Sequence, residues 1–422
     1  MKNSKIFIAN GVSIRDLTDS KFKSSKISIN FIMPLNSETA THTSILTGLL
    51  SQSNSKYPSI TLLSKHLNEL YGADVTSHTS KYGDCLIMNI SVKGIADKFA
   101  LENENLSAIF SQLLSDSIFL PNLDENKLFP AENFEQEKRQ LIEAIDSEIN
   151  EKRLYANSKC REMMFEGEAA QTSKYGTRED AINASCVNSK KVLQEIINNS
   201  LIDILVLGNC NFETVKETLT NSFNFKRDVL TLSNTTSKIK RDFREVIEEQ
   251  NISQSKLILG FKFNEEIKNI NAFRLLALVL GGTASSKFFL NVREKMSLCY
   301  YCSAQIDIQK SVLLVDSGIE TKNIEISKNA ILKEIEDVKN GIISDDELLY
   351  AKLDAINSYK SLGDTLLGTE TFYAKQILND EIQSVDEVIA EIQSTTKEDI
   401  VSLANSMKLD TVFVLKGVQS NE

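Results

Sequence analysis

One order of predicted elements occurs twice in this sequence of 422 residues, and the repeat limits the possible folds more than any other feature. Each copy begins with a segment that alternates apolar and polar residues, at residues 25–31 and 255–261. Alternation with period two is typical of a strand with one buried face. The segments that follow predict, in both copies, two helices, two strands, a long helix, a further helix and a last strand.

The matched segments keep this order throughout. In the first copy we expect helices at 41–52 and 62–71, strands at 74–80 and 86–92, a long helix at 134–154, a helix at 189–199 and a strand at 202–208. In the second copy we expect helices at 271–280 and 287–295, strands at 298–308 and 311–319, a long helix at 345–362, a helix at 396–407 and a strand at 411–417.

The repeat predicts an α+β protein with two homologous domains, each a mainly antiparallel β-sheet with helices packed on one face. Chains of this length also tend to divide rather than to build one core. We place an N-terminal domain at residues 1–227, a polar linker at 228–249 and a C-terminal domain at 250–422.

The composition restricts the partners. The formal net charge is −11, which argues against nucleic acid and anionic membrane surfaces, since both are negatively charged. No apolar run in the sequence is long enough for a membrane span or for the core of an export signal. The six scattered cysteines are therefore expected to be reduced thiols in a cytoplasmic protein.

The stretch at residues 292–304 joins the end of a predicted helix to an aromatic strand. Arg293 and Tyr300 lie on either side of this break, so the guanidinium and the phenol could both point into one cleft and hold a peptide carbonyl. A surface arginine and a half-buried strand tyrosine are an equally simple explanation of the spacing, and both interpretations stay open at this point.

Metal and redox sites find little support in the residue pattern. His42, His66 and His78 form no helical pair with metal-ligand spacing, so we interpret them as ordinary residues and expect no metal or other cofactor. Cys299 and Cys302 form a Cys-x-x-Cys, but residues three apart in a regular strand face opposite sides. That geometry argues against a disulfide or a shared metal.

The two-copy plan and the sequence Ala-Ser-Ser-Lys-Phe-Phe-Leu-Asn-Val-Arg-Glu-Lys from Ala284, followed by Leu298-Cys-Tyr-Tyr, resemble the pitrilysin/insulinase family of metallopeptidases. The resemblance covers the whole chain and implies a LuxS/pitrilysin-like fold. It implies that Arg293 and Tyr300 contact substrate near the scissile bond, and that Gly281-Gly282 forms the family's glycine turn. It also implies that an edge strand, here Ser77, His78 and Thr79, receives extended peptide by strand addition.

The family's zinc ligands are missing from this chain. Active members carry His-x-x-Glu-His on the first helix, and the matching positions here hold Ser44, Thr47 and Gly48. A glutamate on the long helix is the third ligand in the family, and Ala144 is expected at that position. Small residues at these degenerate positions suggest open space, and without the ligands water activation is not expected.

Because it lacks these ligands, the chain is similar to the YmfF-type branch of the family. Members of this branch are regarded as inactive peptidase homologues. The resemblance implies a cytoplasmic, non-catalytic subunit that binds peptide and supports a zinc-bearing sibling in a heterodimer. Two alternatives stay open. One is a structural or chaperone-like homodimeric scaffold, and the other is an active zinc endopeptidase with a rearranged metal site.

Overall fold

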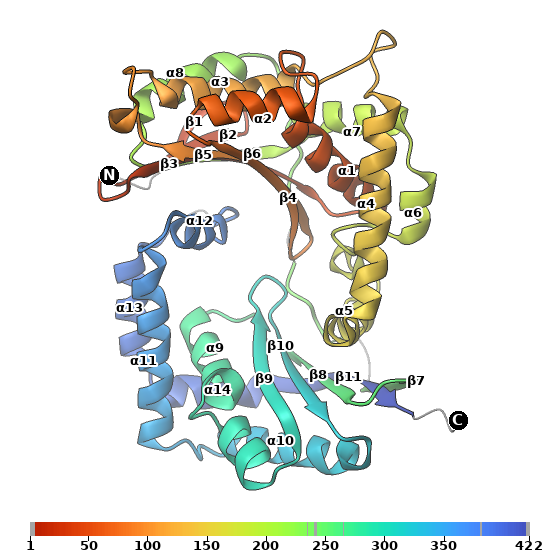
Figure 1. The fold of residues 1–422 in the computed structure, drawn as a ribbon. Coiled ribbons are helices and arrows are strands. Elements are labelled where there is room, and N and C mark those ends of the chain that lie inside the picture. The colour runs from red at the N-terminus through yellow and green to blue at the C-terminus, as the bar shows by residue number, and fades with distance from the viewer. Residues whose placement is uncertain (1–4, 234, 240–242, 265, 380–381, 419–422) are drawn as a thin grey trace. The chain divides into compact units, whose positions relative to one another are not determined.

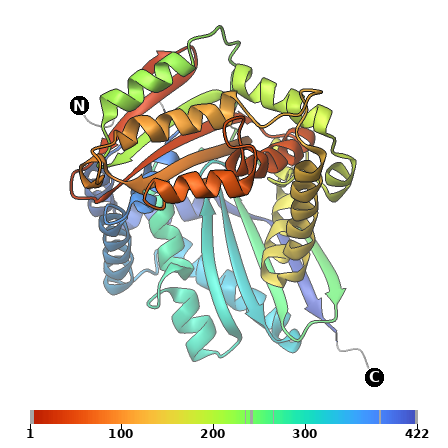
Figure 2. The ribbon, with the colours of Figure 1, turned by 45° about the horizontal axis from the view of Figure 1, so that its top comes forward.

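The computed structural model describes residues 5–233, 235–239, 243–264, 266–379 and 382–418, which form two compact units, each built on one sheet (Figures 1 and 2). The first unit takes the described residues of Met1–Asp146, Thr172–Ser233 and Leu362–Ile382. The second takes those of Ser147–Gln171, Asn234–Ser361 and Gln383–Glu422. Each unit thus contains a segment from the other half of the sequence.

The first unit has a six-stranded sheet in the order β1-β2-β6-β3-β5-β4. Its strands are β1 (Ile6–Ala9), β2 (Val12–Thr18), β3 (Ser24–Pro34), β4 (Asp74–Tyr82), β5 (Cys85–Ile95) and β6 (Leu201–Gly208). Its helices are α1 (Ser37–Gln52), α2 (Ile60–Glu69), α3 (Leu106–Phe119), α4 (Ala131–Asn150), α6 (Arg178–Asn183), α7 (Cys186–Asn199), α8 (Phe212–Ser222) and α12 (Leu366–Ala374).

The second unit has a five-stranded sheet in the order β7-β11-β8-β10-β9. Its strands are β7 (Arg244–Gln250), β8 (Ser255–Phe263), β9 (Cys299–Asp307), β10 (Val312–Ile319) and β11 (Met407–Gly417). Its helices are α5 (Lys152–Met164), α9 (Ile270–Ala277), α10 (Ile324–Lys339), α11 (Asp345–Leu362), α13 (Val385–Ser394) and α14 (Lys397–Ser406), with π-helical turns at Leu278–Gly282 and Phe288–Lys295.

The two sheets share one topology, which confirms the predicted α+β fold with two similar halves. Without β1, the order β2-β6-β3-β5-β4 corresponds strand for strand to β7-β11-β8-β10-β9. In each sheet the first pair is parallel and the other pairs are antiparallel. The matching order is what a duplicated unit should give.

Several features differ from the expected elements. The predicted helix at 134–154 is two helices, because Glu151 takes an extended backbone and its side chain caps the N-terminus of α5. The helices α3 and α10 were not predicted in either copy. The end of the predicted linker at 228–249 forms β7, which pairs in parallel with β11.

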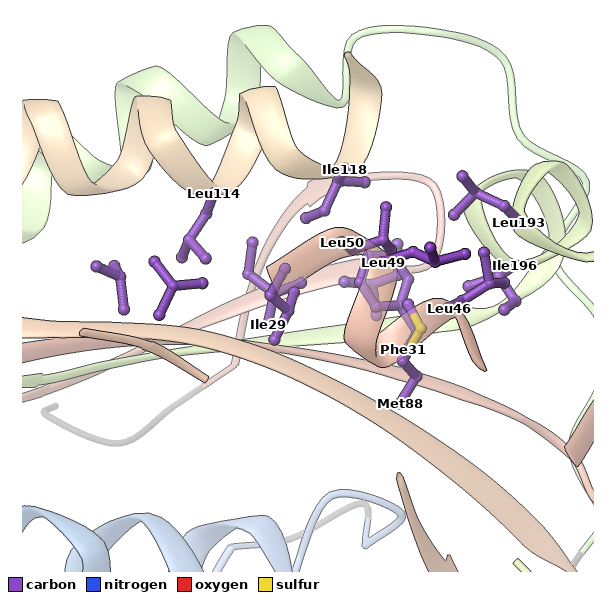
Figure 3. Packing of buried hydrophobic residues seen from close by; sticks show 14 of the residues in the cluster. Ile29, Phe31, Leu46, Leu49, Leu50, Met88, Leu114, Ile118, Leu193 and Ile196 are labelled. Carbon is purple, nitrogen blue, oxygen red and sulfur yellow. The ribbon is translucent and has the colours of Figure 1, made fainter. Parts of the chain in front are cut away.

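One face of the first sheet packs on α1, α3 and α7, and Figure 3 shows this core from close by. Alternation along β3 sends Ile29 and Phe31 toward Leu46 of α1 and Leu114 of α3. All four side chains are fully buried. Burying one such side chain stabilises the fold by about 1.5–3 kcal/mol.

In each unit, the segment from the other half of the sequence packs on the sheet, and we call Ser147–Gln171 and Leu362–Ile382 the exchanged segments. In the second unit, Cys160 and Met164 of α5 share a buried cluster with Ile258 of β8 and Phe413 of β11. Gly260 of β8 makes room for this helix, since a Cβ there would lie 2.2 Å from Met164 Sδ.

The exchanged segment of the first unit is held by charged groups. Arg15 of β2 forms a buried ion pair with Asp203 of β6 at 2.9 Å and also donates to the carbonyl oxygen of Tyr373 in α12. Lys26 of β3 pairs with Glu370 of α12 at 2.6 Å.

Within the described ranges, no helix is long and apolar enough to cross a membrane.

We predict that Met164→Ala destabilises the protein by about 2–5 kcal/mol, because it leaves a cavity between α5 and β8. A lower urea midpoint of unfolding checks this. The control is Lys159→Ala on the same helix, which removes only a partly exposed pair with Glu162 and should change little. Equal midpoints for the two variants would contradict the packing role of α5.

Candidate functional site

The structure brings four of the predicted site residues of the first unit together between α1 and β4. The Ser44 hydroxyl lies 3.3 Å from the Thr79 hydroxyl and donates to the carbonyl oxygen of Lys174 at 3.2 Å. The Thr47 hydroxyl donates to the carbonyl oxygen of Ser44 at 2.7 Å, and the Ser77 hydroxyl donates to the carbonyl oxygen of Thr47. The helix positions and the strand positions therefore form one hydroxyl-rich contact.

The strand in this contact is the last strand of its sheet. β4 pairs only with β5 among the described strands, so its other edge carries backbone groups outside the ladder. Along β4, Thr79 is buried against α1, while His78 is exposed. An edge strand with one anchored face and one exposed face can accept another extended chain.

Glu137 of α4 fills the space beside Gly48, which corrects the expectation of open space at this position. A Cβ built on Gly48 would lie 1.7 Å from Glu137 Oε2. Gln52 of α1 donates to Glu137 Oε1 at 2.9 Å, and burial raises the pKa of Glu137 above its ordinary value. The α4 residue that faces Gly48 is therefore Glu137, whereas Ala144 lies seven residues farther along the helix.

The sequence analysis expected Ala144 at this position of the long helix and did not identify Glu137. A signal was present, since a glycine on one helix can admit a long side chain from a neighbouring helix. A zinc site is not restored whether Glu137 or Ala144 is taken as the α4 residue at the third ligand position. The hydroxyls of Ser44 and Thr47 are not the imidazole and carboxylate ligands that zinc prefers, and Gly48 offers no side-chain ligand.

The described part of the chain contains no group of three or more His, Cys, Asp or Glu side chains placed to hold a metal ion. Two of the three histidines have local roles. His42 Nδ1 lies 2.8 Å from the Ser189 hydroxyl, and burial lowers its pKa. The His66 ring stacks on Tyr57 with centroids 4.4 Å apart. The residues in the family's metal positions therefore do not fit zinc.

In the second unit, a tight reversal joins the π-helical turn Phe288–Lys295 to β9. Ser297 takes the left-handed conformation at φ 51°, and Leu298 N donates to the carbonyl oxygen of Val292 at 3.1 Å. The Arg293 guanidinium lies 4.7 Å from the Phe289 ring centroid and 3.6 Å from Glu294. The expected break between helix and strand is present, although no hydrogen bond joins Arg293 to Tyr300 among the described contacts.

Tyr300 is the extra residue of a β-bulge. In the pairing of β9 with β10, Tyr301 is opposite Gly318 and Cys299 is opposite Ile319, so Tyr300 has no partner in the ladder. Its side chain is 57% exposed. Bulges re-aim side chains and are frequent next to active sites, so the bulge explains how a strand tyrosine is presented to solvent.

Tyr301 is held in place next to the bulge. Its hydroxyl donates to Asp316 at 3.1 Å, and the Arg153 guanidinium lies 4.3 Å from its ring centroid. Gly318 is needed for this arrangement, since a Cβ there would lie 2.3 Å from the Tyr301 ring. The glycine turn lets the chain pass close to β9, because a Cβ on Gly281 would lie 2.7 Å from the backbone nitrogen of Ala304.

The bulge overturns the expectation that Cys299 and Cys302 face opposite sides of β9. One extra residue between them shifts the alternation by one, so both thiols lie on the same side of the strand. The alternation argument failed because it assumed a regular strand.

We predict that Glu137→Gln removes a pH-dependent part of the stability. Because burial raises the folded-state pKa of Glu137 above 4.5, the native protein gains stability as the pH falls from neutral through that raised pKa and down to about 4.5. The variant should lack this gain and be at least as stable as wild type at neutral pH. Urea unfolding at several pH values checks this, with the exposed Glu143→Gln on the same helix as control. An unchanged pH profile for Glu137→Gln would contradict the burial effect.

Comparison with known proteins shows what this chain is similar to. A family model described as peptidase M16 inactive domain matches residues 190–353. The curated protein probable inactive metalloprotease YmfF of Bacillus subtilis (strain 168) is 27% identical over 412 residues, which is 97% of this chain and 96% of that protein.

Solved structures agree with these matches. A conserved protein from Enterococcus faecalis V583 is 26% identical with a TM-score of 0.92, and the match covers 100% of both chains. A peptidase M16 inactive domain from Pseudomonas fluorescens is 14% identical with a TM-score of 0.78, again over 100% of both chains, and this likeness shows the fold alone. The expected resemblance is confirmed: the chain is similar to inactive members of the M16 peptidases, in agreement with the resemblance to the pitrilysin/insulinase family.

Proposed function

We propose that this chain is a non-catalytic subunit that binds extended peptide in the cytoplasm and works beside a zinc-bearing homologous subunit. The observation that carries the proposal is an asymmetry between the two units. The positions that carry the zinc ligands in active family members hold Ser44, Thr47 and Gly48 in this chain. In contrast, the tyrosine that the resemblance implies for substrate contact is present as Tyr300, and a bulge leaves its side chain exposed.

The edge of β4 is the proposed peptide-binding surface of the first unit. An added strand would use the backbone groups of residues 77–79, and the exposed His78 side chain would contact the peptide. The hydrogen bond from Ser77 to α1 and the contact between Thr79 and Ser44 support this role, because they hold the strand in place before a peptide arrives.

Arg293 and Tyr300 are proposed to act on a peptide whose scissile bond lies at the sibling's metal. A phenol hydroxyl can donate to the oxygen that gains negative charge, and a guanidinium can hold a neighbouring carbonyl. Both side chains are accessible, with Arg293 41% and Tyr300 57% exposed. The role requires no metal ligand from this chain.

Two alternatives predict different solution behaviour. A structural or chaperone-like scaffold would be a homodimer whose assembly does not depend on a protein that carries His-x-x-Glu-His. An active zinc endopeptidase with a rearranged site would contain zinc on its own. Co-purification with a His-x-x-Glu-His protein supports the proposed subunit over the scaffold.

We predict that the purified chain contains far less than one zinc per molecule and cleaves no peptide alone, because the imidazole pair and the glutamate base are missing at Ser44, Thr47 and Gly48. Metal analysis by mass spectrometry and a peptide-cleavage assay check this. One zinc per chain, lost together with cleavage on chelation, would establish the rearranged-site alternative.

The same measurement identifies the third ligand position on α4. The double variant Ser44→His/Gly48→His is compared with the triple variant that adds Ala144→Glu. Zinc binding by the double variant would assign the position to Glu137, which faces Gly48, whereas binding that requires Ala144→Glu would support the expectation that Ala144 occupies the third ligand position.

We predict that Tyr300→Phe lowers the turnover of the complex with the zinc-bearing sibling by about a hundredfold, on the order of 3 kcal/mol, because one donor to the developing charge is lost. Assembly should be unchanged, since the side chain is exposed. Arg293→Ala should weaken both substrate affinity and turnover.

The matched control is Tyr350→Phe, which removes the hydroxyl of an exposed tyrosine on α11. It should leave turnover unchanged. If Tyr300→Phe and Arg293→Ala both behaved like this control, the pair would be structural and the scaffold would become the better explanation.

A further inference from the structure

Cys299 and Cys302 form a pair of adjacent thiols at the start of β9. The bulge at Tyr300 brings them to one side of the strand, and Cys302 is opposite Ser317 of β10. Cys299 is partly exposed, whereas Cys302 is 8% exposed. Reagents can therefore reach Cys299 more readily than Cys302, which lies on the same side of the strand.

The surroundings make Cys299 the more reactive thiol. The hydrogen bond from Cys302 lowers the pKa of Cys299, and the Ser317 hydroxyl and the charge of Arg293 lower it further, against the opposing effect of burial. Burial raises the pKa of Cys302. The thiolate is the nucleophilic form of cysteine, so the pair consists of an attacking thiol and a second thiol that can resolve the product.

Three of the other cysteines have pKa values that burial raises. Burial raises the pKa of Cys160 and of Cys210 to about 12. Cys186 is partly exposed, but burial also raises its pKa. Oxidation follows thiolate character and exposure, and Cys299 combines the two with a neighbouring thiol.

We propose that Cys299 and Cys302 form a peroxide-sensitive dithiol that closes reversibly to a disulfide. This inference is independent of the proposed role in peptide handling. The bulge supplies the adjustment that the bridge needs, because Tyr300 has no partner in the ladder and can move as the two sulfur atoms approach bonding distance.

The reaction balances with one hydroperoxide. The Cys299 thiolate attacks a peroxide oxygen, so an S–O bond forms and the O–O bond breaks. The leaving hydroxide takes up the proton that the Cys299 thiol released on ionising and becomes water. The Cys302 sulfur then attacks Cys299 Sγ, so the S–S bond forms and the S–O bond breaks. The second hydroxide takes the Cys302 proton. Two thiols are oxidised and one hydrogen peroxide is reduced to two molecules of water.

The bridge would close a small ring that contains Tyr300 and Tyr301. Tyr301 is already fixed by Asp316 and Arg153, so the change falls on Tyr300 and on the backbone of the bulge. Oxidation would therefore restrict the one residue of β9 that has no partner in the ladder.

The test treats the reduced, full-length protein with one equivalent of hydrogen peroxide and counts free thiols after denaturation. Two of the six thiols should be lost, peptide mapping should find the Cys299–Cys302 bridge, and dithiothreitol should restore both. Cys299→Ser and Cys302→Ala should each abolish the bridge, whereas Cys186→Ser, which alters a partly exposed thiol of the first unit, should leave it intact.

Three results would overturn the proposal. These are oxidation at Cys186 or Cys210 while Cys299 and Cys302 stay reduced, oxidation of Cys299 to sulfinic acid with Cys302 still free, and retention of all six thiols. The peptide map of the wild-type protein decides among them even if a variant fails to fold.

Discussion

In each sheet, a helix from the other half of the sequence packs against the strands, and this packing of the exchanged segments is the constraint on which the rest of the structure depends. In the second unit, Lys310 is fully buried and pairs with Glu168 of the exchanged segment at 2.9 Å. In the first unit, Arg15 donates to a carbonyl oxygen of α12. Removing one partner of a buried ion pair costs about 3–5 kcal/mol, so the pair between Lys310 and Glu168 holds the exchanged segment of the second unit firmly. The boundary predicted at residues 228–249 therefore divides the sequence repeat, whereas each folded unit contains residues from both halves.

The repeat could be predicted because it depends on local periodicity, while the exchange could not. Alternation along β3 identifies the buried face through Ile29 and Phe31 without knowledge of the partner helix. The apolar residues of α5 likewise show that one side of this helix is buried. They carry no information on which sheet covers that side. The break at Glu151, where the predicted long helix is interrupted and α5 begins, depends on one extended residue inside a helical pattern.

The candidate site also contains residues that could be predicted from the sequence and a contact that could not. Family resemblance led to Ser44 and Thr47, and the structure places both beside β4. The family resemblance could not show that the carboxylate of Glu137 occupies the space beside Gly48, because that contact joins two helices far apart in the sequence. A buried carboxylate that accepts a hydrogen bond from Gln52 keeps α1 and α4 in register without a metal ion. The packing of this region can therefore persist after the ligands are gone.

The bulge in β9 connects the exchanged segment to the proposed substrate residue. Arg153 of α5 lies over the Tyr301 ring and also pairs with Asp316, the residue that accepts the Tyr301 hydroxyl. A cation over an aromatic ring and a charge-assisted hydrogen bond both oppose movement of Tyr301. If Tyr301 cannot move along the strand, the extra residue cannot shift to another position, and Tyr300 stays outside the ladder. The helix that completes the second unit thus also fixes the position along β9 at which the bulge occurs, while Tyr300 itself stays free of the ladder.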